Sequence, residues 1–203
     1  DSDVAVIRIP AERLAALRGF VDELLATEPM QAQERWLELF DRGRAMSLLL
    51  FEHIHGESRD RGQAMVDLIS TYRGHGFELG VKQLPDYLPV VLEYLSMRPV
   101  AEVRDWLGHI GHILELLAAR AQERNSTYAA LLEALVETAS GRVDLDLLRK
   151  RVASEERDDT PEAMDRVWEE EAVRFGVEAP GEDCNPPTRL PSGVKRNEPT
   201  VTP

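Results

Sequence analysis

Apolar residues recur along most of this chain at spacings of three and four, the period of an amphipathic helix. The first such run follows Pro10 and predicts a helix over 10–26. Pro29 fits the first position of a second helix, which runs to Phe40. Further runs predict helices after Ser58, after Leu84, over 99–121, after Asn125, over 144–153 and after Pro161.

Residues 44–54 differ from these helices because they are apolar on nearly every side. A helix with that pattern has to be buried by its neighbours on most faces, so we expect it in the core. A polar segment with charges of both signs, residues 55–62, follows directly. Because a loop anchored on a rigid core is a common place for binding residues, this segment is a candidate for a binding surface.

Two prolines four residues apart mark the next irregular point, Leu84-Pro85-Asp86-Tyr87-Leu88-Pro89. Pro85 fits a helix start, whereas Pro89 removes a backbone donor from the first turns. We therefore expect Asp86 and Tyr87 at an irregular helix entry with free N–H groups. Asp86 can cap those groups or contact a ligand, and the two roles are compatible.

The predicted fold class is all-α, because no useful length of chain alternates apolar and polar residues as a half-buried strand does. We expect a single-domain bundle of about seven helices over residues 1–175. Composition changes from Gly176 onward, where six of the twelve prolines fall within 28 residues and large apolar residues nearly vanish. Residues 176–203 are therefore predicted to form a disordered, proline-rich tail.

Charge and composition restrict the classes of partner and of protein that fit this sequence. The 203 residues carry a formal charge of −13, which disfavours nucleic acid and favours a cationic partner such as a basic peptide. No apolar stretch approaches the ~18 residues of a membrane span. Cys184 is the single cysteine and no signal peptide is visible, so we expect a cytoplasmic protein without an intrachain disulfide.

Catalytic motifs are missing from the sequence, since it contains no nucleophile elbow, phosphate-binding loop or zinc-protease signature. The strongest chemical alternative is a metal site made by His109 and His112, with Glu115 three residues further on the same predicted helix face. A metal-dependent helical enzyme and a helical adaptor with no cofactor link thus stay as alternatives. The residues alone favour a binding protein, with no catalytic residue and no resident metal.

Four blocks of sequence carry a family resemblance over roughly residues 10–175. The first is Trp36-x-x-Leu39-Phe40 with its continuation to Arg44, and the second is SLLLFEHIHGESRDRGQAM over 47–65. The third is LPDYLP over 84–89 with LEYL over 92–95, and the fourth is RDDTP over 157–161 with WEEE over 168–171. Together they closely resemble the respiratory nitrate reductase molybdenum-cofactor assembly chaperones, a branch of the redox-enzyme maturation chaperones.

This resemblance implies an all-α chaperone that binds the N-terminal segment of the apo catalytic (alpha) subunit of a membrane-bound nitrate reductase. The chaperone holds this client until molybdenum cofactor is inserted, binds no cofactor stably itself, and has cofactor-delivery proteins as further candidate partners. The family's aromatic-x-x-Leu-Phe motif matches Trp36, Leu39 and Phe40. Its acidic motif matches Asp86, although Tyr87 stands where many relatives carry histidine.

The client segment in this family resembles a twin-arginine leader, in which apolar residues are flanked by positive charge. Such a peptide can fold as an amphipathic helix in a groove. The predicted peptide-binding residues are Trp36, Leu39, Phe40, Leu50, Phe51, Tyr87 and Leu88 as apolar walls, and Glu57, Asp60 and Asp86 facing the cationic end. Asp86→Ala or Tyr87→Ala is expected to weaken peptide binding and to leave the melting temperature nearly unchanged.

Overall fold

The computed structural model describes residues 9–56, 58–80, 82–140 and 145–171. The chain divides into two compact units, Asp1–Glu170 and Glu171–Pro203. The predicted tail over 176–203 belongs to the second unit and lies outside the described residues. Within the described ranges the named elements are ten α-helices and one 3-10 helix without a strand, which confirms the all-α prediction.

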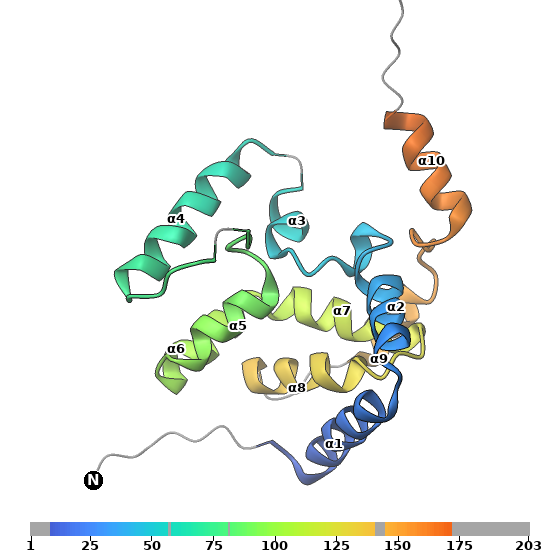
Figure 1. The fold of residues 1–203 in the computed structure, drawn as a ribbon, viewed down its shortest axis with the longest axis horizontal. Coiled ribbons are helices and arrows are strands. Elements are labelled where there is room, and N and C mark those ends of the chain that lie inside the picture. Colours follow the sequence, from blue (N-terminus) through green and yellow to red (C-terminus); the bar gives the residue numbers. More distant parts are fainter. Residues whose placement is uncertain (1–8, 57, 81, 141–144, 172–203) are drawn as a thin grey trace, which may run out of the picture. The chain divides into compact units, whose positions relative to one another are not determined.

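The helices follow one another along the described unit, and the α4–α5 connection is a long loop (Figure 1). Their bounds are α1 Ala11–Ala26, α2 Pro29–Phe40, the 3-10 helix η1 Arg44–Met46, α3 Leu50–His55, α4 Asp60–Gly74, α5 Leu88–Ser96, α6 Val100–His109, α7 Gly111–Glu123, α8 Ala129–Ser140, α9 Leu145–Val152 and α10 Pro161–Glu171.

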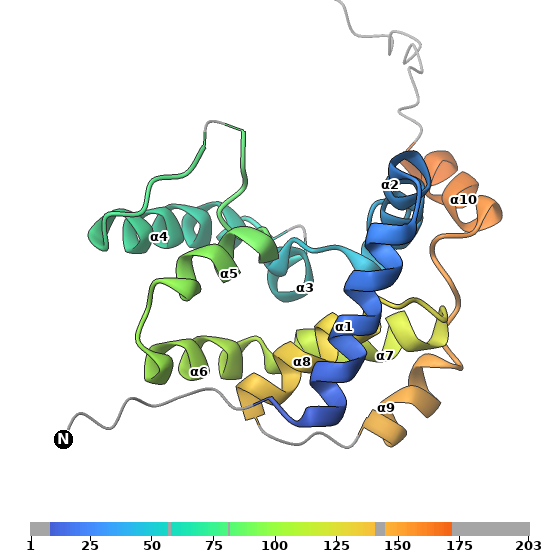
Figure 2. The same ribbon diagram turned by 60° about the horizontal axis from the view of Figure 1, so that its bottom comes forward.

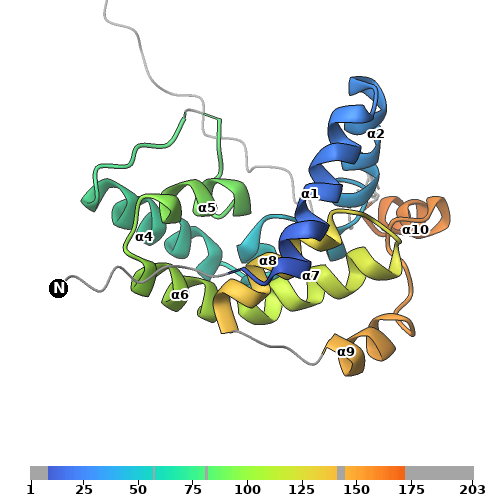
Figure 3. The same cartoon turned by 90° about the horizontal axis from the view of Figure 1, so that it is seen from below.

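The core is centred on α7, which packs against α8, α9 and η1. Its inner face includes Leu114 and Leu117, both with no exposed side-chain surface. Helices α6 and α1 also pack on α8. In all three ribbon views α4 and α6 lie towards one end of the α7–α8 pair, and α2 and α10 lie towards the other (Figures 1, 2 and 3).

The continuous helix predicted over 44–54 is wrong. The chain forms the short helix η1, then an extended stretch through Leu49, and only then α3. The apolar character was read correctly, because Met46 and Leu50 are both buried. The break arises because Leu49 pairs with Tyr87 in an isolated antiparallel bridge, and this tertiary pairing replaces helical hydrogen bonds.

The single helix predicted over 99–121 is also interrupted. Helix α6 ends at His109 and α7 begins at Gly111, with Ile110 between them at φ −97° and ψ 5°. The apolar seam continues across the break, since Leu107, Ile110 and Leu114 are all buried. Apolar residues spaced at a helical period therefore do not guarantee one continuous helix, because two consecutive helices can both contribute to the same buried row of residues.

The positions where helices begin agree better with the sequence signals than the predicted helix lengths do. Glu28 caps α2 by accepting the N–H groups of Met30 and Gln31, and Pro29 is the first residue of that helix. Thr160 Oγ1 accepts Ala163 N–H at 3.2 Å at the start of α10. Helix α5 is the exception: it begins at Leu88, three residues after Pro85, and places Pro89 at its second position.

Helix α1 buries none of its sixteen residues. It is held to the rest of the unit by ion pairs of Arg13 with Glu133 and Glu137 on α8, and by Phe20 against Tyr128. Leu25 is 80% exposed on this helix. Across the described residues, none of the helices combines the length and the apolar character needed to cross a membrane.

Candidate peptide-binding site

The candidate site is assembled where two distant segments, 48–51 and 86–88, pair with each other. Leu50 N–H donates to Asp86 O at 3.0 Å, and Leu88 N–H donates to Leu48 O at 2.8 Å. Five of the predicted peptide-binding residues lie in these two segments: Leu50, Phe51, Asp86, Tyr87 and Leu88. We call this paired region the junction, residues 48–51 and 86–88.

Asp86 ties the junction to helix α3. Its Oδ2 accepts Phe51 N–H at 3.0 Å, so the carboxylate caps a helix that begins 36 residues earlier in the chain, not the helix α5 that follows it. Sequence reasoning had foreseen a capping role, but for the neighbouring helix. A carboxylate at a helix N-terminus is favoured because it satisfies a free N–H group and faces the positive end of the dipole.

Burial is the main influence on the Asp86 carboxylate, which has no exposed surface. Loss of hydration raises its pKa above the usual value, while the Phe51 N–H bond and the nearby Arg61 guanidinium act in the opposite direction. Among the described residues Asp86 Oδ1 has no hydrogen-bond partner. The site therefore holds a buried acceptor with capacity for one further donor.

The turn before Asp86 is fixed from helix α4. Tyr72, fully buried, donates its hydroxyl to Pro85 O at 2.8 Å. Burial raises the pKa of this phenol, so the hydroxyl stays protonated and remains a donor. Helix α4 thus supports the junction through its far end as well as through the ion pair of Arg61 with Glu52 of α3, at 3.6 Å.

The seven predicted wall residues divide by burial. Leu39, Phe40, Leu50 and Leu88 are each more than nine-tenths buried and belong to the main hydrophobic cluster. Trp36, Phe51 and Tyr87 are partly exposed and pack against that cluster. In this conformation, direct contact with a peptide would therefore fall to the three aromatic residues, with the four aliphatic and aromatic core residues behind them.

The aromatic motif at the end of α2 lies next to different neighbours from the junction. Trp36 and Phe40 have ring centroids 5.8 Å apart, and Phe40 meets the edge of Tyr128 at 5.2 Å. Leu39 lines a hollow built from α1, α2, the turn between α7 and α8, and residues Arg157 and Asp159. No junction residue lines this hollow, so Leu39 and the junction face different surroundings among the described residues.

The structure describes two of the three acidic residues predicted for the site, Asp60 and Asp86. Asp60 is exposed at the first position of α4, where its N–H is bonded by Ser58 Oγ at 3.2 Å. Glu57 lies outside the described residues. Glu52, which sequence reasoning did not select, lies beside Asp86 and raises its pKa slightly against the lowering effect of Arg61.

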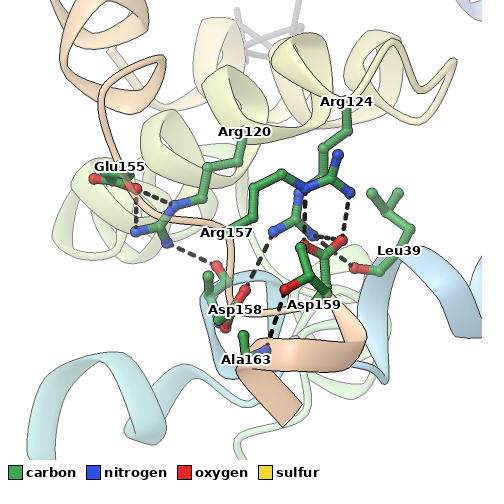
Figure 4. Close-up of polar contacts among 10 residues, drawn as sticks. Leu39, Arg120, Arg124, Glu155, Arg157, Asp158, Asp159 and Ala163 are labelled. Atoms are coloured by element: carbon green, nitrogen blue, oxygen red, sulfur yellow. Dashed lines mark hydrogen bonds and ion pairs between the residues drawn. The ribbon is translucent and has the colours of Figure 1, made fainter. Parts of the chain in front are cut away.

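A second polar cluster, which the sequence did not reveal, holds residues 155–159 against α7 and η1 (Figure 4). Arg120 bonds Glu155 at 2.9 Å, and Arg124 contacts both Asp158 and Asp159. Arg157 bonds Asp159 with two nitrogens, and the pKa of Asp159 is lowered by this pairing first and by Arg124 as well. The available signal was the pair of arginines four apart at the C-terminal end of α7, Arg120 in its last turn and Arg124 directly after it.

The alternative metal site is not assembled. His109 ends α6 and His112 lies in the first turn of α7, so the break at Ile110 separates the residues that were expected on one helix face. Both histidines are exposed, and His109 bonds the backbone oxygen of its own residue i−4, Asp105. Over the described part of the chain no group of three histidine, cysteine or acidic side chains is placed to hold a metal ion.

Relatives of known role resemble this chain over most of its length. It is 52% identical over 167 residues to the nitrate reductase molybdenum cofactor assembly chaperone NarJ of Escherichia coli K12, covering 82% of this chain and 71% of the relative. It is 48% identical over 172 residues to the probable assembly chaperone NarW of the same organism, covering 85% and 73%. The probable NarJ chaperone of Bacillus subtilis is 31% identical over 121 residues, covering 59% and 65%.

A family match agrees with these relatives. Residues 8–144 match the family described as nitrate reductase delta subunit, and this range contains both segments of the junction. The described relatives carry the names of assembly chaperones and not of catalysts. The chain therefore belongs to the nitrate reductase delta subunit family.

Proposed function

We propose that this protein is a dedicated assembly chaperone for a membrane-bound respiratory nitrate reductase. It binds the N-terminal segment of the apo catalytic subunit and holds that subunit while molybdenum cofactor is inserted. The cofactor is cargo for the client, so the chaperone keeps none, and proteins that deliver the cofactor are its candidate partners. The work takes place in the cytoplasm, before the reductase is assembled on the membrane.

The observation that carries this proposal is the junction. Backbone hydrogen bonds bring Phe51 and Tyr87, both partly exposed and aromatic, next to Asp86, a buried carboxylate with an unpaired oxygen. An amphipathic leader helix needs an apolar surface for one face and acceptors for its cationic end. The formal charge of −13 adds attraction for a basic peptide at longer range.

Apolar contact has to supply most of the affinity. Ordering a leader peptide that is disordered when free costs about 2–5 kcal/mol. Partly exposed aromatic side chains are suited to offset that cost, since tyrosine and tryptophan dominate measured interface energies. Asp86 and the exposed Asp60 would then set which end of the peptide lies where, because charges contribute more to orientation than to net affinity.

The proposal is tested by calorimetric titration with a peptide that copies the first ~15 residues of the reductase catalytic subunit. Tyr87→Ala is expected to raise the dissociation constant by about tenfold or more, the loss typical of a buried aromatic anchor. Met97→Ala is the control, because Met97 is 60% exposed just beyond the other end of α5. Equal affinity of both variants would remove Tyr87 from the site.

Asp86 requires a different substitution from the one that the sequence suggested. Alanine would leave Phe51 N–H without its acceptor, so a change in binding could not be separated from a change in stability. Asparagine keeps a carbonyl oxygen for Phe51 and removes only the charge. Weaker peptide binding by Asp86→Asn with an unchanged helical spectrum would support the charge at this position, and unchanged binding would exclude it.

A further inference from the structure

The connector between α2 and α3, residues 41–49, is anchored at two points by parts of the chain far away in sequence. At one end it enters the junction, where Leu48 O accepts Leu88 N–H at 2.8 Å. In its middle, Ala45 is held by the charged cluster of Figure 4. Only η1, a single 3-10 turn, lies between α2 and α3, so the connector has little regular structure of its own.

Both polar backbone groups of Ala45 are taken up by this cluster. Its N–H donates to Asp158 Oδ2 at 2.6 Å, and its carbonyl oxygen accepts Arg120 Nη1 at 2.7 Å. Hydrogen bonds with a charged partner are shorter and about twice as strong as neutral ones. The backbone of the connector is therefore fixed at Ala45 from two sides at once.

Gly43 shows how closely Asp158 approaches the connector. A Cβ atom at Gly43 would lie 2.6 Å from the Asp158 carboxylate, closer than such atoms can come. The φ of Gly43 is −144°, an extended value open to any residue, so it is the space for Asp158 that requires glycine here. Two sequence blocks that looked unrelated, 41–44 and 157–161, thus fit each other directly.

Asp158 is in turn held by the rigid centre of the unit. Arg124 Nη2 contacts its Oδ1 at 3.3 Å, and Arg120, one turn earlier on α7, bonds Glu155 in the same segment. Helix α7 is the most deeply packed helix of the core, so these arginines start from fixed positions. Figure 4 shows Arg120 beside Glu155, and Arg124 beside Asp159 and Leu39 of α2.

We propose that Asp158 is a positioning residue for the candidate peptide-binding site, which it serves by fixing the connector at Ala45; this inference rests on the proposed function. Leu48 is the third residue after Ala45, so the two are at most about 11 Å apart even when the chain is fully extended. A displacement at Ala45 is therefore passed to Leu48 and to Leu49, which forms the bridge with Tyr87. The pairing that brings Phe51 next to Asp86 and Tyr87 depends on that register.

The test compares Asp158→Ala with Glu156→Ala in the full chain. Glu156 lies two residues away, its side chain is 75% exposed, and it pairs with Arg166 and not with the connector. The first readout is amide hydrogen exchange at Leu50, Phe51 and Leu88, whose N–H groups make the junction bonds. Asp158→Ala is expected to speed exchange at these amides severalfold, and Glu156→Ala is expected to leave it at the wild-type rate.

The second readout is affinity for the leader peptide. Asp158→Ala is expected to raise the dissociation constant about three- to thirtyfold, the range seen when a residue acts through others, although it does not touch the junction. Should Asp158→Ala fail to fold, Asp158→Asn replaces it. Asparagine keeps an acceptor for Ala45 N–H and removes the charge towards Arg124, so a smaller change in the same direction is expected.

The two proposals fail in different ways. Junction exchange that is as slow in Asp158→Ala as in Glu156→Ala would overturn the positioning role, whatever the peptide does. Faster junction exchange with unchanged peptide affinity would also overturn it, because the site would then not need the register. A wild-type chain without affinity for the peptide would refute the proposed function, and the exchange readout would still decide whether Asp158 fixes the connector.

Discussion

At the scale of single residues, Asp86 makes two hydrogen bonds that fix the start of α3. Its Oδ2 caps α3 through Phe51 N–H, and its backbone oxygen accepts Leu50 N–H within the junction. The side chain is fully buried, and burial outweighs the nearby Arg61 in its effect on the carboxylate, so the pKa is raised. The folded protein therefore binds a proton at this carboxylate more tightly than the unfolded chain does.

The raised pKa of Asp86 makes a prediction about pH and stability. A group whose pKa is higher in the folded state than its unfolded value of about 3.9 binds its proton more tightly when folded. Its contribution to stability is complete below that unfolded value and is lost as the pH rises through the folded pKa. Asp86→Asn, which has no proton to lose, is expected to gain stability relative to wild type as the pH rises from about 4 to 7.

Urea unfolding at several pH values measures this difference. The matched control is Asp105→Asn, because the Asp105 side chain is 74% exposed at the surface of α6. The control is expected to follow wild type across the range. A stability difference between Asp86→Asn and wild type that does not change with pH would show that burial does not govern this carboxylate.

At the scale of elements, Gly43 and Asp158 link η1 to the segment before α10. Gly43→Ala is expected to destabilise the protein by about 1–3 kcal/mol, because the new methyl group forces the Asp158 carboxylate away from Ala45. Gly19→Ala is the control: Gly19 lies within α1 with nothing within 4 Å of a new Cβ, so alanine there is expected to stabilise by about 1 kcal/mol.

A double-mutant cycle shows whether the steric clash is the cause. In an Asp158→Ala background the carboxylate is gone, so Gly43→Ala is expected to cost much less than it does alone. Thermal or urea unfolding of the four proteins gives the coupling energy. Independent, additive losses would mean that Gly43 matters for a reason other than its approach to Asp158.

How far the sequence predicts these elements depends on whether the signal is local. Pro29 and Pro161 mark helix starts correctly, because capping depends on adjacent residues. The 44–54 helix failed because Leu49 pairs with Tyr87, and the 99–121 helix failed because two helices share one apolar seam at Ile110. A partner far away in sequence decided the first case, and in the second the apolar period alone did not show where one helix ends and the next begins.

The same distinction between local and distant signals decides which residues of the candidate site could be predicted. Apolar pattern and the family resemblance selected Leu50, Phe51, Asp86, Tyr87 and Leu88, and the structure brings these together. The apolar pattern could not show that Leu39 and Phe40 are buried in the core instead of exposed in a peptide groove, since apolar residues recur with the same spacing in both. Nor could it find the contacts of Arg120 and Arg124, which depend on a segment more than thirty residues later.

At the scale of the whole molecule, the excess of acidic residues predicts how a cationic client approaches. With a formal charge of −13, the association rate with a basic leader peptide is expected to fall when salt is raised from 0.05 to 0.5 M. Exposed charges are screened beyond about 10 Å at 0.1 M ionic strength, whereas apolar contacts are not. Stopped-flow mixing measures the rate, and the dissociation rate is expected to change much less.

A peptide in which the arginine and lysine residues are replaced by glutamine is the control for this measurement. Its association rate is expected to be slower at low salt and nearly independent of salt. If the cationic and neutral peptides associate at the same rate in 0.05 M salt, the charge of the chaperone does not guide its client.

The cap that Asp86 supplies to α3 also constrains the order in which the chain folds. Helix α3 has only six residues, and isolated helices of that length do not persist in water. The N–H groups of its first two residues, Leu50 and Phe51, find their acceptors at residue 86, so during synthesis α3 stays unformed until the ribosome has released the chain beyond Leu88. The surface proposed to receive another protein's leader therefore does not exist until that point of synthesis.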